Sequence, residues 1–259
     1  MTTPWFPYPP AAPPRPLRLF CLPPAGGGAS GYRTWIGAFG PDVEVVPVQL
    51  PGRENRLHER PAGSAAELAD RLVAPVLGRA GDRFAVFGHS MGAILAHDLT
   101  HRLCAAGRPP EHLIVSAHRA PQLAARRRWD RPAAEMSGDD LRGYLADRAG
   151  TPREVLDLPE LMDLVLPVLR ADLALCQSYQ DTARTPLPVP LSAFGGADDP
   201  EAGAGELAAW SDRTSAGFRM RLLAGGHGYL FEDVPAVHAA LRAALADPPK
   251  PRPVAAGSS

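Results

Sequence analysis

Short runs of apolar and β-branched residues recur along the chain, and amphipathic segments follow most of them. The runs that predict strands are residues 18–22, 43–48, 83–88, 112–117, 189–194 and 218–223. The patterns that predict helices are residues 64–77, 91–106, 206–214 and 235–245. Strands that are covered on both faces show continuous apolar runs, so this alternation predicts a mostly parallel sheet flanked by helices. The fold class is therefore α/β, of the doubly wound kind.

One interval breaks the alternation of strands and helices. Residues 121–188 contain no convincing strand, whereas 139–148 and 161–179 show helical patterns. A helical segment inserted between two core strands would lie over the carboxyl ends of the sheet, where open α/β folds bind their ligands. We therefore expect residues 121–188 to form a helical lid.

The two ends of the chain differ in composition from the part between them. Residues 1–16 are rich in proline, and residues 247–259 form a polar tail that contains proline, glycine and serine. Such segments bury little apolar surface, so we expect both to be peripheral and the tail to be disordered. Residues 17–246 then form one domain, in keeping with a chain of 259 residues.

Composition and charge exclude several classes of function. The net charge is −1 with both signs scattered, which argues against a nucleic-acid partner. The chain shows neither a signal-peptide pattern nor an apolar run of about 18 residues, which argues against a membrane. The 3 cysteines are widely spaced and are expected to be reduced, without a bound metal. We expect a cytoplasmic protein and, by default, a monomer.

A serine nucleophile is indicated by the segment that follows the predicted strand 83–88. The sequence Gly88-His89-Ser90-Met91-Gly92 fits G-x-S-x-G, and a helical pattern begins directly after it. A sharp strand-to-helix turn of this kind exposes the serine at the tip of the strand. The free N–H groups at the helix start favour a developing oxyanion, and that of Met91 is the expected first donor. This context predicts a serine hydrolase of the α/β-hydrolase fold with Ser90 as nucleophile.

A serine hydroxyl needs a neighbouring imidazole, itself oriented by a carboxylate, to become a strong nucleophile. His227 lies in a glycine-rich loop after the last predicted strand, which places it at the carboxyl edge of the sheet. In this fold the acid precedes the histidine, and Asp198 and Asp199 both follow the strand 189–194. We favour Asp199, because a Gly-x-x-Asp turn before Pro200 is usual in similar hydrolases; Asp198 remains the alternative.

A second oxyanion donor is expected from the loop after the first strand. Residues 22–28 read LPPAGGG, and the N–H of Ala25 is the predicted donor. A phosphate-binding loop is the alternative, but neither G-x-G-x-x-G nor the Lys-Ser/Thr ending of a P-loop occurs there.

Several segments together resemble the stand-alone type II thioesterases of polyketide synthase and nonribosomal peptide synthetase systems. They are FCLPPAGGGASGY at 20–32, VQLPGRENR at 48–56, FGHSMGA at 87–93, LPVLRADLALCQSY at 166–179, FGGADDP at 194–200 and GGHGYLFED at 225–233. Gly228 is a small departure, since similar proteins often carry a bulkier residue after the histidine.

The resemblance implies hydrolysis of acyl thioesters carried on the phosphopantetheine arm of acyl or peptidyl carrier proteins. No cofactor is implied. Two alternatives stay open: an esterase or lipase acting on small free esters, and a ligand-binding protein that keeps the triad without useful turnover. The cluster of arginines at 126–128 could attract an acidic carrier protein, although a solvated charged face is the simpler interpretation.

Overall fold

A central parallel sheet organises the computed structural model, which describes residues 2–123, 131–148, 153–182 and 185–250. Within these residues the sheet has 6 strands in the order β2-β1-β3-β4-β5-β6, and every neighbouring pair is parallel. The strands are β1 (Leu17–Leu22), β2 (Val43–Pro47), β3 (Arg83–His89), β4 (His112–Ser116), β5 (Leu191–Gly196) and β6 (Phe218–Leu223). The predicted fold class is confirmed, and each predicted strand is present with its ends shifted by two residues or fewer.

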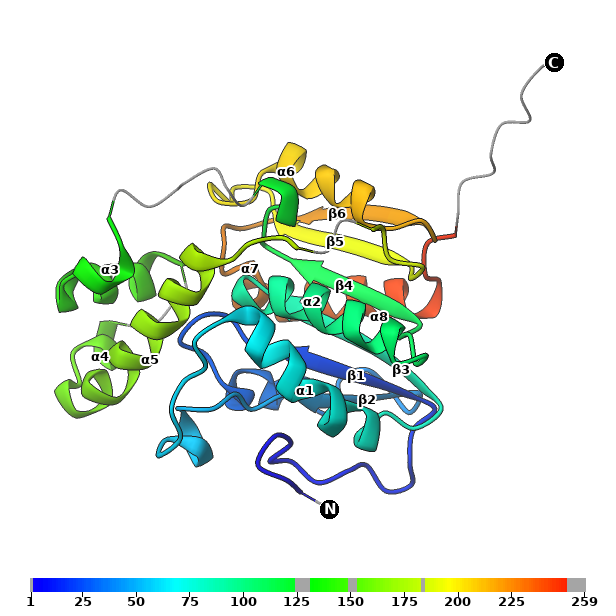
Figure 1. Ribbon diagram of the computed structural model, residues 1–259, viewed down its shortest axis with the longest axis horizontal. Coiled ribbons are helices and arrows are strands. Elements are labelled where there is room, and N and C mark those ends of the chain that lie inside the picture. The colour runs from blue at the N-terminus through cyan, green and yellow to red at the C-terminus, as the bar shows by residue number, and fades with distance from the viewer. Residues whose placement is uncertain (1, 124–130, 149–152, 183–184, 251–259) are drawn as a thin grey trace.

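Alternate residues of the inner strands enter two separate hydrophobic layers. Phe20 and Phe84 belong to the layer under helices α1 (Ala65–Arg79) and α2 (Met91–Ala105). Leu19 and Phe87 belong to the opposite layer, under helix α8 (Val234–Ala246). Figure 1 shows α1 and α2 in front of the sheet and α8 behind it. This two-sided burial is the reason that the strands read as unbroken apolar runs.

The smaller helices depart from the predicted pattern. The predicted helix at 206–214 consists of α6 (Ala204–Ala208) followed by a 3₁₀ segment, η5 (Ala209–Arg213). Helix α7 (Tyr229–Glu232) lies just before α8 and was not predicted, because four residues are too few to display a helical period.

In the parts that the structure describes, the interval between β4 and β5 contains helices and 3₁₀ turns but no strand of the sheet, and Leu187 forms only an isolated parallel bridge with Thr214. The interval contains α3 (Gly138–Arg148), α4 (Arg153–Leu156) and α5 (Pro159–Ser178), together with the 3₁₀ turns η3 (Pro121–Leu123) and η4 (Ala133–Glu135). Figure 1 shows α3, α4 and α5 grouped at the left, beyond the ends of the strands. The arginines at 126–128 lie outside the described residues.

The N-terminal segment is less peripheral than its composition predicts. Phe6 is only 3% exposed and lies in the hydrophobic layer beneath α1, with its ring centroid 5.6 Å from that of Phe20. The N–H of Gln49 donates to the carbonyl of Trp5 at 2.8 Å, and the guanidinium of Arg56 lies over the Trp5 ring. The expectation of a peripheral segment is therefore wrong for these residues, because an aromatic pair among the prolines supplies enough apolar surface to join the core.

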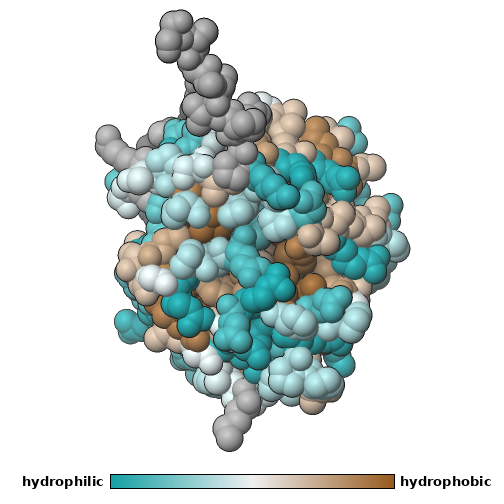
Figure 2. All heavy atoms as spheres, turned by 90° about the vertical axis from the view of Figure 1, so that its right-hand side faces the viewer, coloured by the Kyte–Doolittle hydropathy of each residue, from teal (hydrophilic) through white to brown (hydrophobic). Residues whose placement is uncertain are grey.

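The end of the molecule opposite α3–α5 faces the viewer in Figure 2, where hydrophilic residues run between smaller hydrophobic patches. None of the helices in the described part of the chain combines the length and the apolar character that a membrane crossing requires. Residues 251–259 of the predicted tail lie outside the described residues.

Candidate active site

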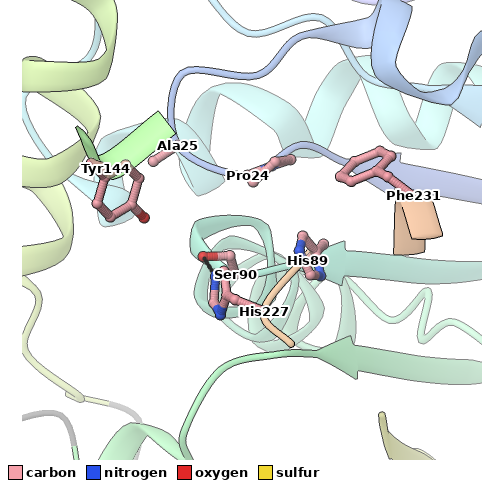
Figure 3. Close-up of a pocket in the computed structure, with 7 residues that line it drawn as sticks. All are labelled: Pro24, Ala25, His89, Ser90, Tyr144, His227 and Phe231. Atoms are coloured by element: carbon pink, nitrogen blue, oxygen red, sulfur yellow. Dashed lines mark hydrogen bonds between the residues drawn. The ribbon is translucent and has the colours of Figure 1, made fainter. Parts of the chain in front are cut away.

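The topology of the sheet brings two loops together at its carboxyl edge. From β1 the chain continues outward to β2 and then returns to β3 on the other side of β1. In open α/β sheets such a reversal of strand order leaves a crevice between the two loops, and ligands bind there. The loop after β1 carries Ala25 and the turn after β3 carries Ser90, and both residues line one pocket (Figure 3).

The turn at Ser90 is tight, and glycine is required on both sides of it. Ser90 has φ 54° and ψ −117°, a region that residues with a side chain rarely occupy. A β-carbon on Gly88 would lie 1.9 Å from the carbonyl oxygen of Gly92. A β-carbon on Gly92 would lie 2.3 Å from the carbonyl oxygen of Leu22. The two glycines thus allow strand, helix and the end of β1 to meet at the serine, as the motif predicts.

Ser90, His227 and Asp199 form a continuous hydrogen-bonded chain. His227 Nε2 lies 2.9 Å from Ser90 Oγ, and His227 Nδ1 lies 3.0 Å from Asp199 Oδ2. The three residues are 7%, 6% and 5% exposed. An ionised carboxylate can only accept, so Nδ1 carries the proton and Nε2 is left to accept the hydrogen of the serine hydroxyl. This is the arrangement in which an imidazole can remove a proton from serine.

His227 reaches Ser90 because the loop after β6 crosses the ends of β5 and β4, the two strands that separate β6 from β3. The loop leaves β6 at the edge of the sheet and passes so close to β5 that a β-carbon on Gly196 would lie 2.1 Å from the carbonyl oxygen of Gly226. Beyond the histidine, the hydroxyl of buried Tyr229 lies 2.7 Å from Ser116 Oγ at the end of β4. The glycines permit the close passage, and the tyrosine anchors the far end.

Of the two candidate acids, the structure brings Asp199 to the histidine. Asp199 is buried, and its second oxygen accepts the N–H of Glu201 at 2.8 Å. Asp198 is exposed, and its N–H donates to the carbonyl of Gly225 at 3.0 Å. Sequence reasoning missed Glu201, whose carboxylate lies 3.9 Å from His227 Nδ1. No spacing rule points to a second acid there.

The pocket around Ser90 includes residues that the sequence analysis did not select. It is lined by Pro24, Ala25, His89, Ser90, Tyr144, His227 and Phe231 (Figure 3). Tyr144 belongs to α3, so the insertion contributes directly to this pocket.

His89 is a buried member of that lining. Its Nδ1 lies 2.9 Å from Ser116 Oγ, and its ring centroid lies 5.5 Å from that of His227. Burial, with a smaller contribution from His227, holds the pKa of His89 well below its usual range. His89 is thus a neutral neighbour of His227 at physiological pH. His89 directly precedes the serine in the G-x-S-x-G motif, and this position could have indicated from the sequence that it lies beside the active site.

The parallel sheet and the hydrogen-bonded serine, histidine and aspartate are the features of an α/β-hydrolase. Comparison with known families is more specific, because the thioesterase domain family matches residues 17–245. The chain belongs to the thioesterase domain family, as the resemblance predicts.

Two named relatives and one solved structure support this membership. The gramicidin S biosynthesis protein GrsT of Aneurinibacillus migulanus is 37% identical over 218 residues, which are 83% of this chain and 84% of that protein. Thioesterase PikA5 of Streptomyces venezuelae is 39% identical over 225 residues, 85% of this chain and 77% of its own. The type II thioesterase BorB from the borrelidin biosynthetic cluster superposes with a TM-score of 0.85 at 36% identity, covering 95% of this chain and 99% of its own.

Proposed function

We propose that this thioesterase hydrolyses acyl groups from the phosphopantetheine arm of acyl or peptidyl carrier proteins, as an editing enzyme of polyketide or nonribosomal peptide synthesis. The relatives support this substrate class: GrsT is named for gramicidin S biosynthesis, and BorB is a type II thioesterase from the borrelidin cluster. The observation that carries the chemistry is the hydrogen-bonded chain from Ser90 through His227 to Asp199, at the crevice where the strand order reverses.

In the proposed first half-reaction, Ser90 Oγ attacks the thioester carbonyl while His227 Nε2 takes the hydroxyl proton. The carbonyl oxygen becomes an oxyanion, which the N–H groups of Met91 and Ala25 stabilise. The tetrahedral adduct then expels the phosphopantetheine sulfur, to which the imidazolium returns the proton. The acyl group stays on Ser90 as an ester. Asp199 holds the imidazole in the required tautomer and stabilises its positive form.

In the second half-reaction His227 removes a proton from water, and the resulting hydroxide attacks the acyl-serine carbonyl. Collapse of the second tetrahedral adduct releases the carboxylic acid and returns the proton to Ser90 Oγ. No step requires a cofactor.

The helical insertion between β4 and β5 is assigned the role of the lid. The support for this role is that Tyr144 of α3 lines the pocket with Ser90 and His227 (Figure 3). An acyl chain bound to Ser90 would therefore meet side chains of the insertion, which makes these helices the place where acyl-chain preference is set.

The decisive experiment follows release of acyl groups from a panel of acyl-loaded carrier proteins by mass spectrometry. Wild-type protein is expected to unload the carrier, and Ser90→Ala is expected to lower the rate by at least about 10³-fold, because both half-reactions pass through Ser90. Acyl-CoA and p-nitrophenyl esters are assayed in parallel. A strong preference for the free oxygen esters would contradict the carrier-protein proposal in favour of an esterase. Failure of the wild type to react with a fluorophosphonate would favour a binding protein.

A further inference from the structure

A buried ion pair links the helical insertion to the segment that follows β2. Arg53 Nη1 donates to Asp172 Oδ2 at 2.6 Å, and Arg53 Nη2 donates to Asp172 Oδ1 at 2.9 Å. Asp172 lies on α5 and is 2% exposed, and Arg53 is 5% exposed. The two residues are 119 positions apart in the chain. The reaction described above uses neither side chain, so this paired charge in the interior needs another explanation.

The same two side chains also hold the loop that carries Ala25. Asp172 Oδ2 accepts the N–H of Gly26 at 2.8 Å, and Arg53 Nη1 donates to the carbonyl of Gly27 at 3.0 Å. Both contacts are to the backbone of the residues directly after Ala25. The pair therefore fixes the path of the main chain at the point where the second oxyanion donor is proposed.

Packing from α5 acts on the same point. A β-carbon on Gly26 would lie 3.2 Å from Leu169 Cδ1, and Leu169 precedes Asp172 on α5 by nearly one turn. Gly26 has φ +74°, a conformation that favours glycine. An apolar contact and a charged hydrogen bond from one face of α5 thus meet a single glycine, and leave the loop little freedom to shift.

From this geometry we propose that Asp172, held by Arg53, is a positioning residue that keeps the Ala25 N–H where the oxyanion forms. The inference rests on the proposed function, which assigns Ala25 as an oxyanion donor. Oxyanion donors act through preorganisation, and a displacement of about 1 Å can cost about 10²-fold in rate. Because the donor matters most in the transition state, disturbing it lowers kcat and leaves KM nearly unchanged.

The test compares Asp172→Asn with a matched control, Glu44→Gln. An asparagine keeps one acceptor oxygen, but its amide nitrogen is a donor that must face either Arg53 or Gly26, which are donors as well. Glu44 is also a buried carboxylate, bound by Arg79 at 2.6 Å, by Arg18 at 3.0 Å and by the N–H of Ala11 at 3.2 Å. It lies on β2 near the strand's amino end, away from Ser90.

We expect Asp172→Asn to lower kcat by about 10- to 100-fold with KM changed less than about threefold. Glu44→Gln should lower the melting temperature but leave kcat within about twofold of the wild type. Arg53→Lys keeps the charge without the bidentate contact, and should give an intermediate loss of kcat. Arg53→Lys also answers the question if Asp172→Asn does not fold.

A transition-state analogue provides a readout that a merely structural role would not move. A trifluoromethyl ketone with an acyl tail adds to Ser90 and presents an oxyanion, so its inhibition constant should rise in proportion to the loss of kcat/KM. A thioether analogue of the substrate, which lacks the carbonyl and therefore forms no oxyanion, should bind all variants alike. Equal losses of kcat in Asp172→Asn and Glu44→Gln, or an analogue that binds Asp172→Asn as tightly as wild type, would overturn the inference.

The design separates this inference from the proposed function. Every variant is assayed on a p-nitrophenyl ester as well as on an acyl-carrier protein, because both substrates form an oxyanion. If the wild type cleaves only the aryl ester, the carrier-protein proposal fails. The role of Asp172 is then still decided by comparing the kcat of each variant with that of the wild type on the aryl ester. If Ser90→Ala is inactive and Asp172→Asn resembles the wild type, only the positioning role is lost.

Discussion

Ser90 combines a demanding backbone conformation with a side chain that must stay free to react. Its positive φ is held by the surrounding contacts, since the N–H of Ser90 donates to the carbonyl of Ser116 at 2.8 Å and its carbonyl accepts the N–H of Ala93 at 2.9 Å. Strain of this kind persists where neighbouring structure fixes it, and here it points the hydroxyl at His227. The motif made this residue predictable, because the sequence requirement is local.

The choice between Asp199 and Asp198 can be tested by a matched pair of substitutions. Asp199→Asn should lower kcat by about 10³- to 10⁴-fold, because an amide next to Nδ1 favours the wrong imidazole tautomer. Asp198→Asn should leave kcat within about twofold, since Asp198 is exposed and interacts through its backbone. Steady-state rates on one acyl substrate are sufficient. A larger loss in Asp198→Asn than in Asp199→Asn would reverse the assignment.

At the scale of elements, the predicted strands and long helices match the structure because their signals are strong and local. β3 is buried on both faces and reads as an apolar run, and α1 has the spacing of an amphipathic helix capped by Ser64. The short helices α4 and α7 were missed because each is only four residues long. Phe6 was missed because proline-rich surroundings mask its contribution to the core.

Two glycines on the helices that cover the sheet predict opposite effects of the same substitution. Gly92→Ala should unfold or inactivate the protein, because the added carbon would lie 2.3 Å from a backbone oxygen at the end of β1. Gly78→Ala should stabilise it by about 0.5–1 kcal/mol, because Gly78 lies in α1 with open space around the added carbon. Urea unfolding of both variants measures the difference. A Gly92→Ala protein with wild-type stability and activity would show that the turn at Ser90 is less tightly packed than its contacts indicate.

At the scale of the whole molecule, parallel topology made much of the site predictable. The carboxyl ends of parallel strands share one edge, so a serine, an acid and a histidine after three different strands were expected to meet. The link between Arg53 and Asp172 carried no such signal. Both residues lie in segments that carry the family resemblance, but nothing in those segments indicates that they pair. They meet only because α5 packs against the loop after β1.

Buried histidines should make the stability of the whole fold depend on pH. Burial lowers the pKa of His89 well below its usual range and that of His112 to about 4. Between about pH 6.5 and 4, the unfolded chain binds protons that these folded residues exclude, so the free energy of unfolding falls as the pH is lowered. Each histidine should contribute about 1.4 kcal/mol of loss between pH 7.5 and 5.5.

The measurement is urea unfolding at pH 7.5, 6.5 and 5.5, with His112→Asn as the comparison. His112 is the first residue of β4 and therefore lies at the amino end of the strand, whereas Ser90 lies at the carboxyl edge of the sheet. The Nε2 of His112 is 3.0 Å from Ser192 Oγ. Replacing His112 should reduce the loss of unfolding free energy between pH 7.5 and 5.5 by the contribution of one histidine, about 1.4 kcal/mol. Parallel curves for the variant and the wild type would exclude His112 as a contributor.

The anchoring of α5 divides the insertion into two parts that differ in how freely they can be exchanged. Leu169 and Asp172, near the middle of this helix, contact the loop that carries Ala25, the proposed oxyanion donor, whereas α3 contributes Tyr144 to the wall of the pocket. A chimera that takes α3 and α4 from a related thioesterase and keeps its own α5 should therefore show the acyl-chain-length preference of that relative. Its kcat should stay close to that of the wild type. A chimera that replaces the entire insertion, α5 included, would change both the acyl-chain preference and the contacts that hold the loop carrying Ala25.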